Sequence, residues 1–181
     1  SAGNNNQSTN SIAIGNSAGK INQNIQCVAI GNEAGYDTQG YESIAIGNLA
    51  GKDNQNLRSV AIGSNAGGDN QSFNCVAIGH LAGYEDQSNS SIAIGNQAGR
   101  NFQNQTSVAI SEQSGMLSQG MISIAIGYRA GHDSQGNYSV AIGSNSGKNS
   151  QEYRTVAIGY NAGTTTQGHQ SVAIGSNAGY T

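Results

Sequence analysis

The chain has 181 residues and a formal net charge of -3, and only 9% of its residues are charged while 35% are hydrophobic. The few Lys and Arg residues form no basic patch that could neutralise phosphates, so we do not expect nucleic acid as a partner. No apolar run approaches the roughly 20 residues of a membrane-spanning helix, so any membrane anchor would lie outside this segment.

A repeat of sixteen residues runs along the whole chain. Glutamine recurs at this interval without insertion or deletion, at Gln7, Gln23, Gln39, Gln55, Gln71, Gln87, Gln103, Gln119, Gln135, Gln151 and Gln167. A repeat this short cannot bury a core by itself, so the repeats must stack. We therefore expect residues 1–181 to form a single repeat domain. Because residues 1–3 already align with residues 17–19, we expect this domain to be a segment of a longer array.

Each repeat contains one short predicted strand, and its clearest copy is Ser43 to Gly47. Its β-branched residues and terminal glycine are typical of a strand, and the residues that follow, up to Ala50 and Gly51, predict a turn. No segment between glycines is long enough for a helix. If every copy stacks in parallel register, the backbone groups pair above and below. The sequence thus predicts an all-β fold, a parallel β-solenoid or β-roll with sixteen-residue coils.

Such a coil aligns identical side chains in ladders. Two ladders are predicted to be structural, one of isoleucine (Ile14, Ile30, Ile46 and Ile62) and one of glutamine (Gln23, Gln39, Gln55 and Gln71). We expect the glutamine amides to lie in or near the interior and to hydrogen-bond along their ladder.

The alanine between the two apolar residues of each strand never changes along the chain. Strand side chains alternate, so alanine faces one side and Ile or Val the other. Because the residue types are restricted on both sides of the strand, we expect both faces to be buried. We favour Ile and Val inside, with Ala45, Ala61 and Ala77 against another chain; the reverse assignment and a monomer with crowded alanines are the alternatives.

Cys27 and Cys75 occupy the same position of repeats three coils apart, where serine is usual. At about 4.8 Å per coil they would be about 14 Å apart, beyond the roughly 7 Å limit for a disulfide. We therefore expect two free thiols.

Four acidic residues stack in successive coils, Asp37, Asp53, Asp69 and Glu85. Each neighbouring pair repels, and a divalent cation could offset that repulsion because it prefers carboxylate oxygens. These residues are weak candidates for a metal site. The alternative is a solvated turn with Lys52 nearby.

The repeat position two residues after the glutamine is apolar in four successive coils, at Ile25, Tyr41, Leu57 and Phe73. If it points outwards it is a possible interface with a partner chain, or a surface on which sugars stack. The alternative is a purely structural stack of similar side chains. Four tyrosines at variable turn positions could also bind a ligand, namely Tyr36, Tyr84, Tyr128 and Tyr160.

One coil departs from the pattern, with Ser111 in place of glycine and Ser114 in place of alanine, followed by Met116 and Leu117. Drift in a long array explains this better than a binding face. The histidines His80, His132 and His169 occupy different repeat positions in distant coils and cannot converge on a metal. We expect no cofactor and no enzymatic activity.

The segments 59–63, 139–143 and 171–175 read Ser-Val-Ala-Ile-Gly. They resemble the head repeats of trimeric autotransporter adhesins of the YadA type, and the resemblance covers essentially the whole chain. It implies a left-handed parallel β-roll, association of three chains, and binding of host matrix or surfaces. Similar repeats also occur in viral and phage fibre proteins.

These observations predict a non-enzymatic fibre or adhesin, a rigid rod displayed outside the cell, on a cell surface or on a virion. Its expected partner is itself, as a homotrimer, with a host surface or glycan as a possible second partner. One alternative is a filament subunit that stacks head to tail, since an open coil end exposes unpaired backbone groups. A weaker alternative is a solenoid that binds carbohydrate or calcium.

Overall fold

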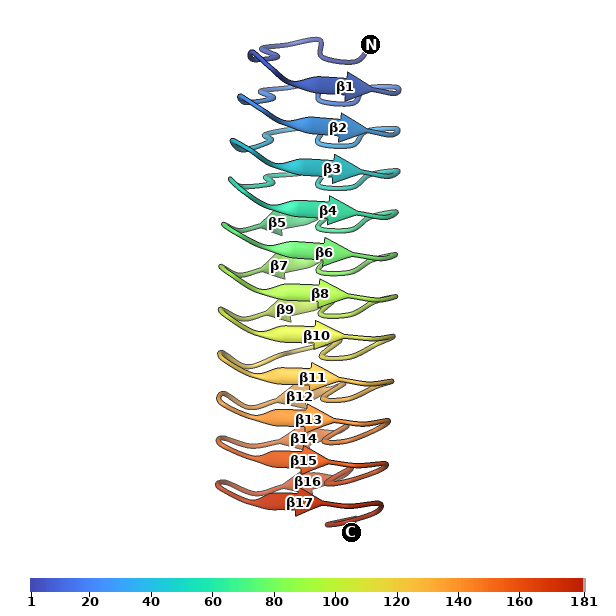
Figure 1. Cartoon of the computed structure of the whole chain (residues 1–181), viewed down its shortest axis with the longest axis vertical. Coiled ribbons are helices and arrows are strands. Elements are labelled where there is room, and N and C mark those ends of the chain that lie inside the picture. The colour runs from blue at the N-terminus through green and yellow to red at the C-terminus, as the bar shows by residue number, and fades with distance from the viewer. Residues whose placement is uncertain (181) are drawn as a thin grey trace.

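The computed structural model describes residues 1–180 and shows a rod of stacked coils with no helix in that range (Figure 1). Each coil adds one strand to an eleven-stranded parallel sheet, whose members we call the front strands. In sheet order they are β1 (Ile12–Ile14), β2 (Val28–Ile30), β3 (Ile44–Ile46), β4 (Val60–Ile62), β6 (Val76–Ile78), β8 (Ile92–Ile94), β10 (Val108–Ile110), β11 (Ile124–Ile126), β13 (Val140–Ile142), β15 (Val156–Ile158) and β17 (Val172–Ile174). The predicted all-β parallel solenoid is confirmed.

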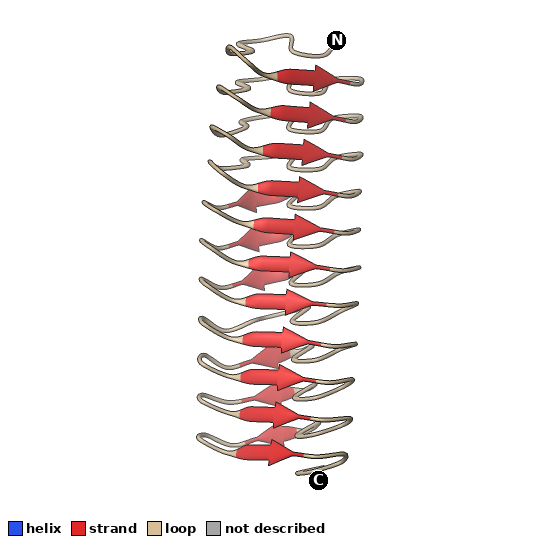
Figure 2. Cartoon of the chain, in the orientation of Figure 1, coloured by secondary structure: helices blue, strands red, loops and turns tan. Residues whose placement is uncertain are grey.

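Further strands of two or three residues run along the opposite side of the rod, and we call them the back strands (Figure 2). One group is β5 (Asp69–Gln71), β7 (Glu85–Gln87) and β9 (Asn101–Gln103), and the other is β12 (Ser134–Gln135), β14 (Ser150–Gln151) and β16 (Thr166–Gln167). Isolated parallel bridges, such as Gln23 to Gln39, continue this side in other coils. In Figure 1 the front strands run left to right as the chain descends, so the coil is left-handed.

The register between coils is sixteen residues throughout, as in the pairs Ala29 with Ala45 and Asp69 with Glu85. Backbone hydrogen bonds continue through the turns, for example from the Gly19 amide to the Ala34 carbonyl at 2.9 Å. The turns therefore belong to the ladder as much as the strands do, which makes the rod continuous along its length.

The interior holds small and polar side chains, so the predicted orientation of the front strands is wrong. Ala45, Ala61 and Ala77 are fully buried within their own coil, and Ile or Val on either side of each alanine points outwards. The isoleucine ladder of Ile14, Ile30, Ile46 and Ile62 is in register but lies on the outside. The physical reason is the short distance between front and back strands, which leaves room for a methyl group but not for a branched side chain.

Glutamine spans this narrow interior. The Gln55 Nε2 donates to the Ile44 carbonyl of a front strand at 2.8 Å and to Gln71 Oε1 of the next coil at 3.1 Å. The same amide-to-amide bond links successive glutamines without interruption from Gln23 to Gln119. Each amide from Gln23 to Gln119 thus has partners across and along the rod, which is the condition for burying a polar group at low cost.

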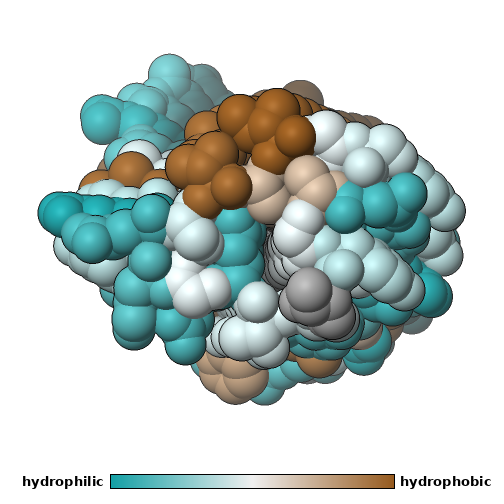
Figure 3. All heavy atoms as spheres, turned by 90° about the horizontal axis from the view of Figure 1, so that it is seen from below, coloured by the Kyte–Doolittle hydropathy of each residue, from teal (hydrophilic) through white to brown (hydrophobic). Residues whose placement is uncertain are grey.

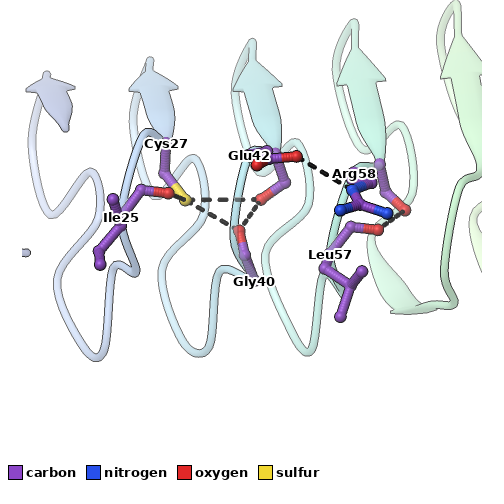
Figure 4. A network of polar contacts seen from close by, with 8 residues as sticks. Ile25, Cys27, Gly40, Glu42, Leu57 and Arg58 are labelled. Atoms are coloured by element: carbon purple, nitrogen blue, oxygen red, sulfur yellow. Dashed lines mark hydrogen bonds and ion pairs between the residues drawn. The ribbon is translucent and has the colours of Figure 1, made fainter. Parts of the chain in front are cut away.

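Serine and cysteine close the interior on the side of the turn that precedes the front strand. Ser43 Oγ donates to the Gly40 carbonyl at 2.5 Å, and Cys27 Sγ donates to the same carbonyl at 2.8 Å (Figure 4). Both cysteines are free and buried, as expected from their spacing. Burial raises the pKa of the Cys75 thiol, which therefore stays protonated and unreactive.

From Gly15 to Gly159, each glycine that directly follows a front strand has no room for a side chain. At Gly79 the backbone has φ of +127°, and an added Cβ would lie 2.6 Å from the Gly95 carbonyl oxygen. Ser111 occupies this position with φ of +104°. A side chain in this region of φ is strained, so the irregular coil carries a local cost.

Replacing Ser111 with glycine should therefore stabilise the rod. We expect Ser111→Gly to raise the free energy of unfolding by about 1 to 2 kcal/mol, because glycine adopts positive φ without steric penalty. Thermal unfolding followed by circular dichroism measures the change. The matched control is Ser144→Gly, one position later in its repeat and with ordinary φ, which should leave stability unchanged or lower it. Equal effects of the two variants would contradict the strain at Ser111.

The glutamine ladder gives a second test. Gln71→Leu leaves the Val60 carbonyl and Gln87 Oε1 without their hydrogen bonds inside the rod, and we expect a loss of about 2 to 4 kcal/mol in unfolding free energy. Gln135→Leu is the control, because Gln135 Oε1 accepts no hydrogen bond and the ladder is already interrupted there. Thermal unfolding of both variants should show the larger loss for Gln71→Leu. A larger loss for Gln135→Leu would show that the bonds along the ladder contribute little.

Candidate functional site

The first and third residues of the eleven front strands form one continuous surface, which we call the outer apolar face. Every one of these residues is Ile or Val, and in the inner coils each is half-buried, by its neighbours in the ladder. At the rod ends Ile14 is 58% and Val172 66% exposed. Figure 3, which looks along the rod from its C-terminal end, shows the hydrophobic atoms gathered on this side. A surface of this length and composition is typical of an interface between chains.

The acidic ladder of Asp37, Asp53, Asp69 and Glu85 lies on the back of the rod. Desolvation raises the pKa of the Asp53 carboxyl, Lys52 lowers it, and the neighbouring Asp69 and Asp37 raise it further. Lys52 Nζ lies 3.9 Å from Asp53 Oδ2. Within residues 1–180 no group of three His, Cys, Asp or Glu side chains could hold a metal ion, so the stacked carboxylates do not converge as metal ligands.

The apolar line of Ile25, Tyr41, Leu57 and Phe73 lies at the corner that leads into the front strands, and we call it the apolar corner. Tyr41 is 52% and Phe73 42% exposed. In Figure 4 Ile25 and Leu57 project from the same side of this turn. Beside Leu57 lies an ion pair in which Arg58 Nε is 3.0 Å from Glu42 Oε2. The line is thus available to a partner or ligand and is not part of the interior.

An aromatic cluster further along the same corner was missed from the sequence. The rings of Tyr138 and Tyr153 meet edge to face with centroids 5.5 Å apart, and the Arg154 guanidinium lies 4.8 Å from the Tyr153 centroid. The two tyrosines come from successive coils but from adjacent repeat positions. A comparison of the same repeat position in successive coils overlooks this pair. A comparison of neighbouring repeat positions in successive coils would have found it.

The remaining candidates are scattered over the surface. Tyr128 and Tyr160 are exposed, whereas Tyr36 and Tyr84 are half-buried on the back of the rod. His132 contacts Asp133 and His169 contacts Glu152, two coils apart. In the irregular coil Met116 is half-buried and Leu117 is exposed. None of these residues is brought together with another into a group with catalytic geometry among the residues described.

The raised pKa of Asp53 predicts how stability depends on pH. A carboxyl whose folded pKa is raised contributes its full stability below the unfolded pKa, about 4, and loses it as pH rises through the folded value. Asp53→Asn should therefore raise the melting temperature at pH 7 and leave it unchanged at pH 3. Thermal unfolding at both pH values measures this. In the control, Asp133→Asn, the residue pairs with His132 and has Leu117 and Asn149 as its neighbours in the ladder, so no rise is expected. A lower melting temperature of Asp53→Asn at pH 7 would contradict the prediction.

Comparison with known proteins gives one match, to the model of a protein family. No curated protein and no solved structure matches the chain. No helix in residues 1–180 is long and apolar enough to cross a membrane. The family model of the YadA head domain repeat matches two copies, at residues 134–146 and 153–178. These residues include front strands β13, β15 and β17 and the whole connection from β15 to β17. The resemblance inferred from the sequence is therefore confirmed for these coils, which are similar to YadA head repeats.

Proposed function

We propose that this chain is a rigid segment of a non-enzymatic surface adhesin or fibre that works as a homotrimer outside the cell. The observation that carries the proposal is the outer apolar face. Two β-branched side chains from each of eleven strands form a hydrophobic surface that runs along the whole rod. Removing that surface from water gives a large driving force for association, at about 25 cal/mol per Å² buried.

The geometry of the ladders favours parallel association. Because coils repeat at one fixed spacing, chains related by an axis parallel to the rod keep every rung beside the same rung of their partners. Three chains around such an axis can direct all their outer apolar faces inwards. The match of residues 134–146 and 153–178 to YadA head repeats supports three as the number, since YadA-type adhesins form trimers.

The rest of the surface fits an attachment role. Two faces of each coil, the back and the corners, would remain in water and vary along the rod, from the acidic ladder to the apolar corner and the aromatic cluster. The continuous backbone ladder gives a stiff scaffold of roughly 50 Å for eleven coils, which can hold such surfaces away from a membrane. We propose a cell surface as the location, and residues 1–181 as one domain within a longer array.

The test is the mass of the purified chain in solution by light scattering over a concentration series, with electron microscopy of the same samples. We expect a discrete trimer. Ile78→Asp places a charge on the outer apolar face and should reduce the trimer to monomer, because burying an unpaired carboxylate is costly. Asn70→Asp, on the exposed back of the rod, is the matched control and should leave the trimer intact.

Two outcomes would contradict the proposal. Growth into threads with rising concentration would favour the filament subunit that stacks head to tail. A wild-type monomer at all concentrations would remove the argument from the outer apolar face. Circular dichroism of Ile78→Asp should still show β structure, which separates loss of assembly from loss of folding.

A further inference from the structure

A cavity of about 270 Å³ opens on the back of the rod beside Gly68. Gly68 is the single glycine at its position of the repeat. In the other coils this position carries Asn4, Lys20, Tyr36, Lys52, Tyr84, Arg100, Met116, His132, Lys148, Thr164 and Tyr180. One missing side chain thus leaves a gap between Lys52 and Tyr84 in a stack of longer residues.

Backbone geometry does not require glycine here. The φ of Gly68 lies outside the left-handed region, so any residue could adopt its conformation. An added Cβ would lie 2.6 Å from Cε2 of the Tyr84 ring, which shows that the ring leans over Gly68. What the glycine provides is the space itself, with an aromatic ring as one wall.

The other walls are mostly polar and chemically mixed, and Leu49 adds an apolar side chain to them. The carboxyl groups of Asp53 and Asp69 lie on one side, with the Lys52 ammonium beside Asp53, and Asn65 lines the cavity from the preceding turn. The carboxylates accept hydrogen bonds, the ammonium donates, and the Asn65 amide does both. Opposite charges are present together, and Lys52 already supplies a cation to the carboxylates. The lining therefore carries two carboxylates against one ammonium, and among the residues described no third acidic, His or Cys side chain joins them to hold a metal ion.

We propose that this cavity binds one neutral sugar residue of a glycan. A sugar ring combines several hydroxyl groups, which both donate and accept, with a flat face of C–H bonds that packs on an aromatic ring. Asp53, Asp69, Lys52 and Asn65 match the hydroxyl groups, and Tyr84 matches the flat face. The volume lies just below the range of about 300 to 1,000 Å³ for drug-sized ligands, which suits a single ring.

The site belongs to one chain and lies on the side of the rod away from the outer apolar face. It deepens the proposed attachment role by naming a ligand class, but it does not depend on assembly. If the chain is a trimer, three copies of the cavity lie at the same height on the rod. A glycan-bearing surface could then be held by several weak contacts at once, which raises the overall affinity.

The experiment is a titration of the full chain with methyl glycosides of glucose, galactose, mannose and N-acetylglucosamine, followed by saturation-transfer difference NMR in the presence of a chelator. We expect at least one glycoside to bind saturably, with Kd on the order of millimolar. Gly68→Tyr should abolish binding by filling the cavity. Asp69→Asn should weaken binding about tenfold, because it removes a charged acceptor.

The chain offers a closely matched control. Gly68 lies between Lys52 and Tyr84 in its stack, and Thr164 lies between Lys148 and Tyr180 at the same repeat position. Thr164→Tyr therefore introduces the same side chain between the same two neighbours and should bind as the wild type does. Tyrosine is tolerated at this position, since Tyr36 lies between Lys20 and Lys52 and accepts a hydrogen bond from Lys20 Nζ at 2.9 Å.

Three results would overturn the proposal. These are no saturable binding of any of the four glycosides, binding that survives in Gly68→Tyr, and binding that appears only when calcium replaces the chelator. If Gly68→Tyr fails to fold by circular dichroism, Asp69→Asn decides instead. Failure here is separate from failure of the trimer, because Ile78→Asp should lose assembly and keep sugar binding.

Discussion

The narrow interior of the coil is the constraint on which the rest of the structure depends. A glutamine side chain from the back strand reaches the carbonyl of a front strand, at 2.8 Å for Gln55 and Ile44. Between such closely spaced strands only a methyl, hydroxyl, thiol or amide group fits. The hydrophobic effect therefore contributes less inside this chain than in an ordinary core, and buried hydrogen bonds in ladders take a larger share. The branched apolar side chains must lie outside, where they form the outer apolar face.

The repeat made the fold predictable, because a fixed period with identical residues at identical positions allows few structures other than stacked coils. It did not show which face of the front strand points inwards. Because side chains alternate along a strand, Ala45 must face the opposite side from Ile44 and Ile46. Which of the two sides faces the interior depends on the distance to the back strand. The glutamine position could have indicated the orientation. If Gln55 is interior and crosses to the front strand, there is no room left for isoleucine beside it.

The candidate surfaces were predicted where they follow one repeat position and missed where they do not. The acidic ladder and the apolar corner each lie along one position, and both stack as the sequence indicates. The tyrosine pair crosses positions, from Tyr138 to Tyr153. The cavity at Gly68 depends on a side chain that is absent and on the tilt of the Tyr84 ring. Sequence can show the glycine, but the direction of the ring comes only from packing.

Separation of the two sides of the rod explains how a uniform fold can carry varied surfaces. The backbone ladder, the glutamines and the alanines are the same in nearly every coil, and they set the register without help from the outward-facing residues of the back. Substitutions at outward positions of the back strands and corners therefore change the surface without changing the fold. A single glycine such as Gly68 alters the shape of the rod at one height only, since the coils above and below keep their own contacts. On a rod of this kind one substitution can add or remove a cavity on the back, while the outer apolar face stays unchanged.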